Sequence, residues 1–258
     1  MNTHIDRHNK INITMNCLLN NSNSYKISSN TRYKHHHTRQ KINDNINPKF
    51  NILMRCTYRP GTFEHAIKSI LLQEYNNYHI YICYDDPDCL QYLKKYLNHP
   101  NITITISPNV PQNSKFFYNL YCNYLLEFVT NGWFLFLDDD DILMSPKTLL
   151  TISKNINYDN DIIFWKVKIG NYIIYPKNFS KFNLGDVSGI GFCINYKYKS
   201  YGKWKDISGA DCSYITQINN SGIKFNHKMI PEVLTGTISM NCGNLGKKEK
   251  KNNNIIAV

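Results

Sequence analysis

The sequence contains no long hydrophobic run. Its apolar stretches, such as residues 133–137, fall far short of the roughly 18 to 20 residues that a membrane-spanning helix needs. The first ten residues, MNTHIDRHNK, also lack the apolar segment of a secretory signal peptide. We therefore expect no transmembrane segment and a cytoplasmic location. The bias toward Asn, Ile, Lys and Tyr is typical of an AT-rich genome such as that of a protist or a large DNA virus, and in the viral case the cytoplasm would be that of the infected host cell.

Paired cysteines are also lacking. The chain has eight cysteines, and no two of them form a CxxC pair. Scattered spacing without an export signal favours reduced, buried thiols over disulfides or a structural zinc site.

Acidic residues are few compared with basic ones, 19 against 30, which leaves a net charge of +11. Most of this excess lies near the two ends. Residues 1–47 hold seven Lys or Arg against two Asp or Glu, and residues 247–258 hold four against one. Polybasic tails attract anionic surfaces in general, so we expect at most a weak contact of this kind through the tails.

Composition divides the chain into three parts. Residues 1–47 are rich in Asn, Ser, Thr and Lys without periodicity, which predicts a disordered basic arm. Residues 241–258 are predicted to form a flexible basic tail. Between them, residues 48–240 alternate short apolar runs with amphipathic stretches and are predicted to form one α/β domain.

The first half of this domain follows a strand-helix repeat. Strands are predicted at 51–57, 78–84, 102–106 and 133–137, with helices between them. This order implies a mostly parallel, Rossmann-like sheet. The second half is predicted to be mixed, with a hairpin over 161–175 and a helix over 211–220.

Four consecutive aspartates, Asp138 to Asp141, follow the predicted strand 133–137. Each pair of such carboxylates repels by about 3 kcal/mol at an effective dielectric constant near 20. A divalent cation would convert this repulsion into binding energy, and the expected ion is Mg²⁺ or Mn²⁺. Asp138 and Asp140 are two positions apart, so in an extended chain both would face the same side of the crevice where such sheets bind ligands. A solvated acidic turn is the alternative.

Two other predicted strands also end in polar groups. Thr57, Tyr58 and Arg59 follow the first strand, and Asp85 and Asp86 follow the second. Hydroxyl, aromatic and carboxylate groups suit the base and ribose of a nucleotide. Asp86 is explained equally well as the cap of the helix that begins at Pro87.

Three segments together resemble the family 2 glycosyltransferases of the GT-A fold. They are NILMRCTYRPGTFEHAIKSILLQEYNNYHIYICYDDPD, NGWFLFLDDDDIL and SGADCSYITQINNSGIKF. The family pattern has a T-Y element after the first strand, an S-I-L-x-Q helix, an acidic pair after the second strand and L-D-x-D-D after the fourth. The similarity extends over about residues 50–235. Each motif alone is common in proteins, but their order and spacing are specific to the family.

This resemblance implies a GT-A fold with a mixed acceptor-side half. It also implies an inverting transfer of a sugar from a UDP- or GDP-sugar to a glycan, lipid or protein acceptor, with Mn²⁺ or Mg²⁺. The resemblance implies that Asp138 and Asp140 bind the metal and that Asp211 is the catalytic base. The residues that it implies for donor binding are Thr57, Tyr58, Arg59, Asp85, Asp86, Asp138 and Asp139.

The sequence departs from the family pattern at two points. The Glu-Asp pair expected at the start of the late helix is Ala210-Asp211, which leaves Asp211 as the base and Asp206 in reserve. Near residues 234–239, where many relatives carry a His or Arg, the chain offers only hydroxyl groups. We therefore predict no third metal ligand.

Two other functions fit parts of the sequence. A phosphatase of the haloacid-dehalogenase type would use Asp138 as nucleophile and Asp140 as acid, although its motif normally follows the first strand and here follows the fourth. A nucleic-acid or anionic-surface binder would explain the basic tails and the 19 tyrosines, most of which are predicted to face a core.

Overall fold

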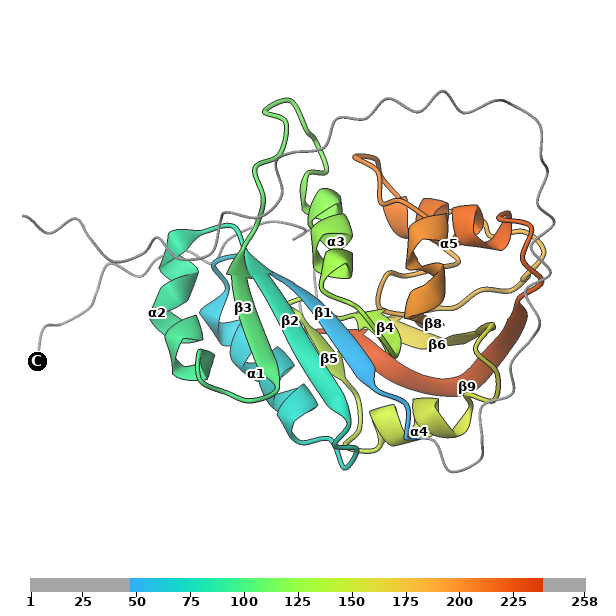
Figure 1. The fold of residues 1–258 in the computed structure, drawn as a ribbon, viewed down its shortest axis with the longest axis horizontal. Helices are drawn as coiled ribbons and strands as arrows, with labels where there is room; N and C mark the ends of the chain where they lie inside the picture. Colours follow the sequence, from blue (N-terminus) through green and yellow to red (C-terminus); the bar gives the residue numbers. More distant parts are fainter. Residues whose placement is uncertain (1–46, 239–258) are drawn as a thin grey trace, which may run out of the picture. The chain divides into compact units, whose positions relative to one another are not determined.

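A computed structural model describes residues 47–238, whose fold is drawn in Figure 1. The predicted basic tail, and the predicted arm except for Asn47, lie outside these residues. One sheet of nine strands runs through the described part, with eight strands in the order β3-β2-β1-β4-β8-β6-β9-β5. These strands are β3 (Ile102–Ile106), β2 (Tyr78–Tyr84), β1 (Phe50–Cys56), β4 (Trp133–Phe136), β8 (Phe192–Asn195), β6 (Asp161–Ile169), β9 (Asn226–Thr237) and β5 (Asp141–Leu143), while β7 (Tyr172–Ile174) pairs with β6.

The first half of the sheet is parallel, as predicted. β1 pairs in parallel with β2 and with β4, and β2 pairs in parallel with β3. The second half is mixed: β8 is antiparallel to both β4 and β6, whereas β9 is parallel to β6 and antiparallel to β5. The predicted α/β class with a mostly parallel first half and a mixed second half is confirmed.

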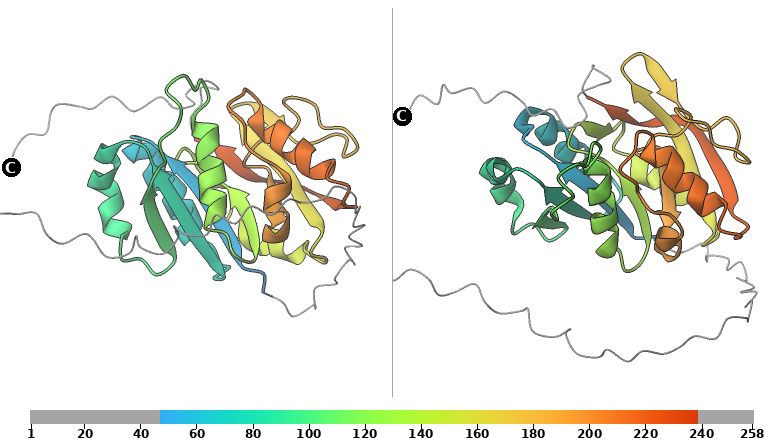
Figure 2. Two further views of the ribbon diagram at one scale, coloured as in Figure 1. Left: turned by 45° about the horizontal axis from the view of Figure 1, so that its top comes forward. Right: turned by 90° about the horizontal axis from the view of Figure 1, so that it is seen from above.

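Helices cover both faces of the sheet (Figures 1 and 2). The alternate residues Ile52 and Met54 of β1 belong to a core that includes α1 (Pro60–Leu71), α2 (Leu90–Leu93) and α4 (Thr148–Lys154). Leu53 faces the opposite way, into a second core with α3 (Tyr118–Glu127) and α5 (Ala210–Asn219). A strand that is buried on both faces needs apolar residues at nearly every position, which explains the run FNILM in β1.

Local sequence explains where several elements begin. Pro60 occupies the first turn of α1, where its missing N–H costs nothing. Asp86 accepts a hydrogen bond from the backbone N–H of Asp88 at 2.9 Å and so caps a 3₁₀ turn that starts at Pro87. The single helix predicted after Asp86 is divided into that turn (Pro87–Cys89), α2 and a second 3₁₀ turn (Lys94–Tyr96).

Two strands do not follow from the sequence pattern. β5 is only three residues long, too short to show periodicity. β9 is 12 residues long but contains Pro231, and the pairing register of β6 with β9 shifts between Trp165 and Val167. A bulge of this kind accommodates a proline, which cannot donate a ladder hydrogen bond.

The described cysteines are free and buried: Cys56, Cys83, Cys89, Cys122, Cys193 and Cys212. Among the described residues, no helix combines the length and the hydrophobicity that crossing a membrane requires.

Candidate functional site

The carboxyl ends of β1, β2 and β4 lie at one edge of the sheet because these neighbouring strands are parallel. Thr57, Asp85 and Asp138 follow these ends and line one small cavity of about 30 Å³. The other residues around this cavity are Arg55, Cys56, Arg59, Phe117, Tyr118, Tyr121 and Asp140. The structure therefore brings together groups from all three strand ends.

A second cavity of about 260 Å³ lies beside the first. It is lined by Asp211 at the start of α5, by Asp138, Asp140 and Asp141, and by Thr237 of β9. Four residues line both cavities, namely Arg55, Tyr118, Asp138 and Asp140. The cluster Asp138–Asp141, which we call the aspartate quartet, thus contributes to a wall between the two cavities.

Two arginines pair with three of the four quartet carboxylates and so offset part of their charge. Arg55 Nε donates to Asp138 Oδ1 at 2.8 Å, and Arg55 Nη2 pairs with Asp138 Oδ2. Arg59 Nη2 lies 2.6 Å from Asp139 Oδ1, while its Nη1 pairs with Asp140 Oδ2. Each quartet residue is at most 8% exposed, so these ion pairs operate with little solvent screening.

The three other hydrogen bonds of the quartet side chains come from two backbone N–H groups and one hydroxyl. Asp139 Oδ2 accepts a hydrogen bond from the backbone N–H of Thr57 at 2.9 Å. Asp141 accepts hydrogen bonds from the backbone N–H of Asp138 at 3.1 Å and from the hydroxyl of Thr237 at 2.8 Å. Burial raises the pKa of Asp139 and of Asp141 well above the ordinary aspartate value.

Asp140 is better placed than Asp138 to bind a divalent ion. Within residues 47–238, Asp140 Oδ1 is the one quartet oxygen that makes neither a hydrogen bond nor an ion pair with another residue. Both oxygens of Asp138 are held by Arg55, and the described residues contain no group of three His, Cys, Asp or Glu arranged around one point. Magnesium and manganese sites often use one or two carboxylates together with substrate phosphates and water. The residues therefore fit an ion that is held by Asp140. Asp138 could bind the same ion only after its ion pair with Arg55 had been broken.

The residues predicted for donor binding separate into two groups. Thr57, Arg59 and Asp85 line the smaller cavity, and Asp85 Oδ1 is buried without a hydrogen-bond partner in the described residues. Tyr58 and Asp86 line neither of the two cavities. For Asp86, the cap that it forms is a sufficient structural explanation.

Asp211 is positioned by the start of α5. Gly209 has a φ of +69°, and the chain turns there so that Ala210 and Asp211 enter the helix. Asp211 Oδ1 accepts from the N–H of Cys212 at 2.8 Å, and its Oδ2 accepts from the N–H of Gly189 at 3.1 Å. Burial raises the pKa of Asp211, although these two hydrogen bonds and the charge of Arg55 oppose the shift.

Asp206, the reserve candidate, lies outside both cavities. Its carboxylate accepts hydrogen bonds from the backbone N–H groups of Lys115 and Phe116, just before α3. These bonds explain Asp206 as a residue that holds the segment before α3.

Arg55 and Tyr118 were missed by the sequence analysis. Arg55 Nη1 donates to the carbonyl oxygen of Tyr118 at 3.2 Å and to Asn119 Oδ1 at 3.3 Å, and its guanidinium lies 5.5 Å from the centre of the Tyr118 ring. One signal was available: Arg55 is the only charged residue in the strand FNILMRC. A charge in a buried strand requires a partner, and that partner is Asp138.

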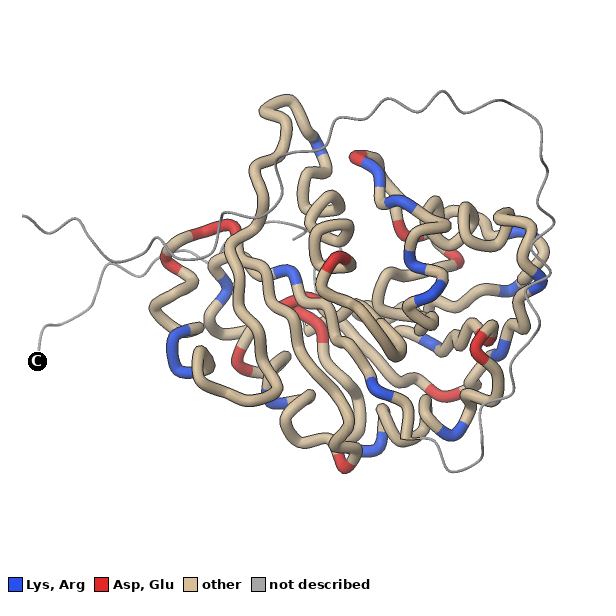
Figure 3. Tube along the Cα trace, in the orientation of Figure 1, with Lys and Arg blue, Asp and Glu red and all other residues tan. Residues whose placement is uncertain are grey.

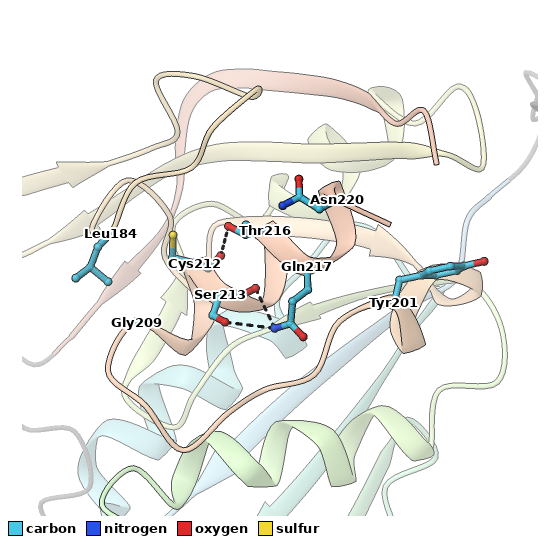
Figure 4. Close-up of a pocket in the computed structure, with 8 residues that line it drawn as sticks. All are labelled: Leu184, Tyr201, Gly209, Cys212, Ser213, Thr216, Gln217 and Asn220. Carbon is cyan, nitrogen blue, oxygen red and sulfur yellow. Dashed lines mark hydrogen bonds between the residues drawn. The ribbon is translucent and has the colours of Figure 1, made fainter. Parts of the chain in front are cut away.

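An open pocket of about 620 Å³ is lined mostly by residues in and next to α5 (Figure 4). Leu184 and Tyr201 stand at its two ends in this view, and between them lie Cys212, Ser213, Thr216, Gln217 and Asn220. Gly209 lines both this pocket and the cavity that contains Asp211. The lining carries no Lys, Arg, Asp, Glu or His, so the pocket is uncharged, with hydroxyl and amide groups set among apolar ones.

Comparison with known proteins identifies the fold. No protein-family model matches the sequence, and a search of the curated proteins finds no match. Among solved structures, S. aureus TarS matches with a TM-score of 0.60 at 14% identity, over 74% of this chain and 37% of TarS. A TarS 1–349 structure in complex with UDP-GlcNAc matches with a TM-score of 0.58 at 15% identity, over 78% of this chain and 62% of that one.

The mannosyltransferase PcManGT from Pyrobaculum calidifontis, in complex with GDP-Man and Mn²⁺, is also similar. Its TM-score is 0.55 at 15% identity, over 77% of this chain and 59% of the mannosyltransferase. The chain thus spans between 37% and 62% of the length of the chains in these three structures. It has the GT-A glycosyltransferase fold, as the sequence predicted, while its membership of family 2 stays a prediction.

Proposed function

We propose that this protein is an inverting glycosyltransferase that moves a sugar from a nucleoside diphosphate donor to an acceptor hydroxyl. The observation that carries the proposal is the wall of Asp138 and Asp140 between two adjoining cavities. One cavity has Thr57 and Asp85 for the nucleoside, and the other has Asp211 for the acceptor. A sugar nucleotide that lay across this wall would have its diphosphate beside the quartet and its sugar toward Asp211.

The smaller cavity suits the nucleoside chemically. The buried, unpartnered Asp85 Oδ1 is an acceptor for a ribose hydroxyl or a base N–H, since a buried carboxylate oxygen without a partner is costly. Its volume of about 30 Å³ is close to that of one water molecule. Donor binding therefore requires the side chains around this cavity to move apart.

Asp211 is the proposed general base. Direct inversion at the anomeric carbon needs a carboxylate within hydrogen-bond reach of the acceptor hydroxyl, on the side opposite the leaving group. Burial raises the pKa of Asp211, and a carboxylate with a higher pKa is a stronger base. The absent glutamate at position 210 leaves this carboxylate as the one acidic group in the first turn of α5.

A Mn²⁺ or Mg²⁺ ion is proposed as the cofactor. Asp140 Oδ1, the donor phosphates and water would hold it, and when bound it supplies positive charge to the departing diphosphate. The support in this chain is the free oxygen of Asp140 in a wall that both cavities share.

For the acceptor, the uncharged pocket on α5 favours a glycan. Hydroxyl and amide side chains with a tyrosine are groups that bind neutral sugars. Gly209 lines this pocket as well as the cavity of Asp211, which provides a short path to the base.

Neither alternative function has comparable support. A phosphatase needs Asp138 as a free nucleophile, whereas Arg55 holds both of its carboxylate oxygens. A nucleic-acid binder needs a basic face, whereas residues 47–238 hold 19 basic and 16 acidic residues, and both kinds are scattered over the trace in Figure 3.

Calorimetry with a panel of UDP- and GDP-sugars in Mn²⁺ tests the proposal. We expect the wild-type protein to bind at least one donor and Asp140→Ala to lose that binding. Glu74→Ala, which removes one exposed carboxylate outside both cavities, is the matched control and should bind normally. Absence of heat with every donor would contradict the proposed function.

A further inference from the structure

Arg55 lies where the two cavities meet. It lines both of them, and its side chain is 16% exposed. Among the described residues that line the larger cavity, Arg55 is the only Lys or Arg. Arg59 is the second cation of the site, but it lines only the smaller cavity of the two.

The guanidinium of Arg55 has one N–H group to spare. Arginine carries five N–H donors, two on each terminal nitrogen and one on Nε. Nε and one Nη2 donor bond Asp138, and the two Nη1 donors are taken by Tyr118 and Asn119. Within the described part of the chain, the second Nη2 donor has no acceptor. The four bonds hold the guanidinium in place, so binding of an anion does not include the entropic cost of ordering the Arg55 side chain.

We propose that Arg55 is a catalytic residue that donates this hydrogen bond to the β-phosphate of the donor. The inference rests on the proposed function, because the sugar–phosphate bond of a donor that spans both cavities would lie at their shared wall. Arg55 would then act in addition to Asp140, and no sequence motif assigns it this role.

The reaction explains why a cation is needed at this point. The acceptor oxygen forms a bond to the anomeric carbon while the bond from that carbon to the β-phosphate oxygen breaks. The acceptor proton passes to Asp211, and the bonding electron pair leaves with the β-phosphate. Negative charge therefore increases on the β-phosphate during transfer, and a fixed donor aimed at that charge stabilises the transition state more than the bound substrate.

Comparing nucleoside diphosphates with monophosphates distinguishes a contact between Arg55 and the β-phosphate from a purely structural role of Arg55. A nucleoside diphosphate carries the β-phosphate, whereas the corresponding monophosphate lacks it but retains the base, the ribose and the α-phosphate. We would measure the affinity of UDP, UMP, GDP and GMP by calorimetry, with Mn²⁺ and separately with EDTA. The proteins are full-length wild type, Arg55→Gln and the double variant Arg55→Gln with Asp138→Asn.

The double variant is needed because Arg55→Gln leaves Asp138 buried without its counter-ion, which destabilises a fold strongly. With Asn at position 138 both charges are removed together, and the two amides can bond each other. Lys68→Gln removes one exposed positive charge on α1 and serves as the control for net charge. Thermal unfolding of every variant reports whether it is folded.

We expect the folded Arg55 variants to bind the preferred diphosphate about tenfold or more weakly, and its monophosphate within about twofold of wild type. The loss should persist in the double variant, and Lys68→Gln should behave as wild type. An equal loss for the monophosphate, or recovery of diphosphate affinity in the double variant, would show that Arg55 acts only on the local structure and would overturn the proposal. A wild-type protein that binds none of the four nucleotides would instead refute the proposed function.

Discussion

Thr237, in the last strand of the sheet, donates its hydroxyl hydrogen to Asp141 at 2.8 Å. The two residues also face each other in the antiparallel pairing of β5 with β9. The hydroxyl-rich segment near residue 237 therefore completes the aspartate quartet, at a position where the family resemblance led us to look for a His or Arg.

Thr237→Val should destabilise the protein by about 1 to 3 kcal/mol, since valine preserves the shape but leaves a buried oxygen of Asp141 without a donor. Urea unfolding measures the change. Thr130→Val, at an exposed position, is the control and should alter the free energy of unfolding by less than about 0.5 kcal/mol. Equal stability of the two variants would mean that the hydroxyl of Thr237 does not support Asp141.

Arg59→Gln should cost about 3 to 5 kcal/mol of stability, because it leaves Asp139 fully buried and Asp140 nearly so without their cation. Combining it with Asp139→Asn should restore part of that loss. Chemical unfolding of the single and double variants measures their coupling, with Lys68→Gln again as the control for charge. Strictly additive effects would contradict a direct ion pair.

Asp211→Asn should lower the rate of sugar transfer by about 10²- to 10⁴-fold and leave donor affinity unchanged, since the amide cannot accept the acceptor proton. Asp206→Asn is the matched control, and it also tests the reserve candidate. Its transfer rate should stay close to that of wild type. A large loss in Asp206→Asn with full activity in Asp211→Asn would exchange the two assignments.

The pH dependence of sugar transfer should follow the protonation of Asp211. A base must be unprotonated to work, so activity should fall as the pH is lowered through the pKa of Asp211. Because burial raises this pKa, the acidic limb of the rate profile should have its midpoint above the ordinary aspartate value of about 3.9. The profile of kcat/KM for the acceptor measures it, and a midpoint at or below that value would contradict Asp211 as a base with a raised pKa.

Gly209→Ala and Gly222→Ala should destabilise the protein by similar amounts. Both glycines have a positive φ, +69° and +86°, so both substitutions strain the backbone by about 1 to 2 kcal/mol. A Cβ at Gly209 would also lie 2.1 Å from Leu184 Cδ1, but this atom ends a side chain that is 74% exposed and can turn away, while a Cβ at Gly222 would meet nothing within 4 Å. Thermal unfolding of the two variants checks this, and a much larger loss at Gly209 that Leu184→Ala relieves would contradict it.

The parallel half of the sheet was predictable because its signals are local. The bounds of 78–84 and 102–106 agree with the observed β2 and β3, and the first strand differs by one residue at each end. In these segments the spacing of apolar residues, with turn residues at the ends, already specifies a strand. The acidic cluster was visible for the same reason, as a polar segment directly after a buried strand.

Only the tertiary structure decided what the aspartates touch. Arg55 and Asp138 are 83 positions apart, and Thr237 and Asp141 are 96 positions apart, so neither pair leaves a periodic signal in the sequence. The sequence by itself determined that four carboxylates would stand at a strand end and that their repulsion needed compensation. Which groups compensate it depends on the strands that become neighbours in the sheet, because electrostatic interactions act over a few ångströms in space regardless of separation along the chain.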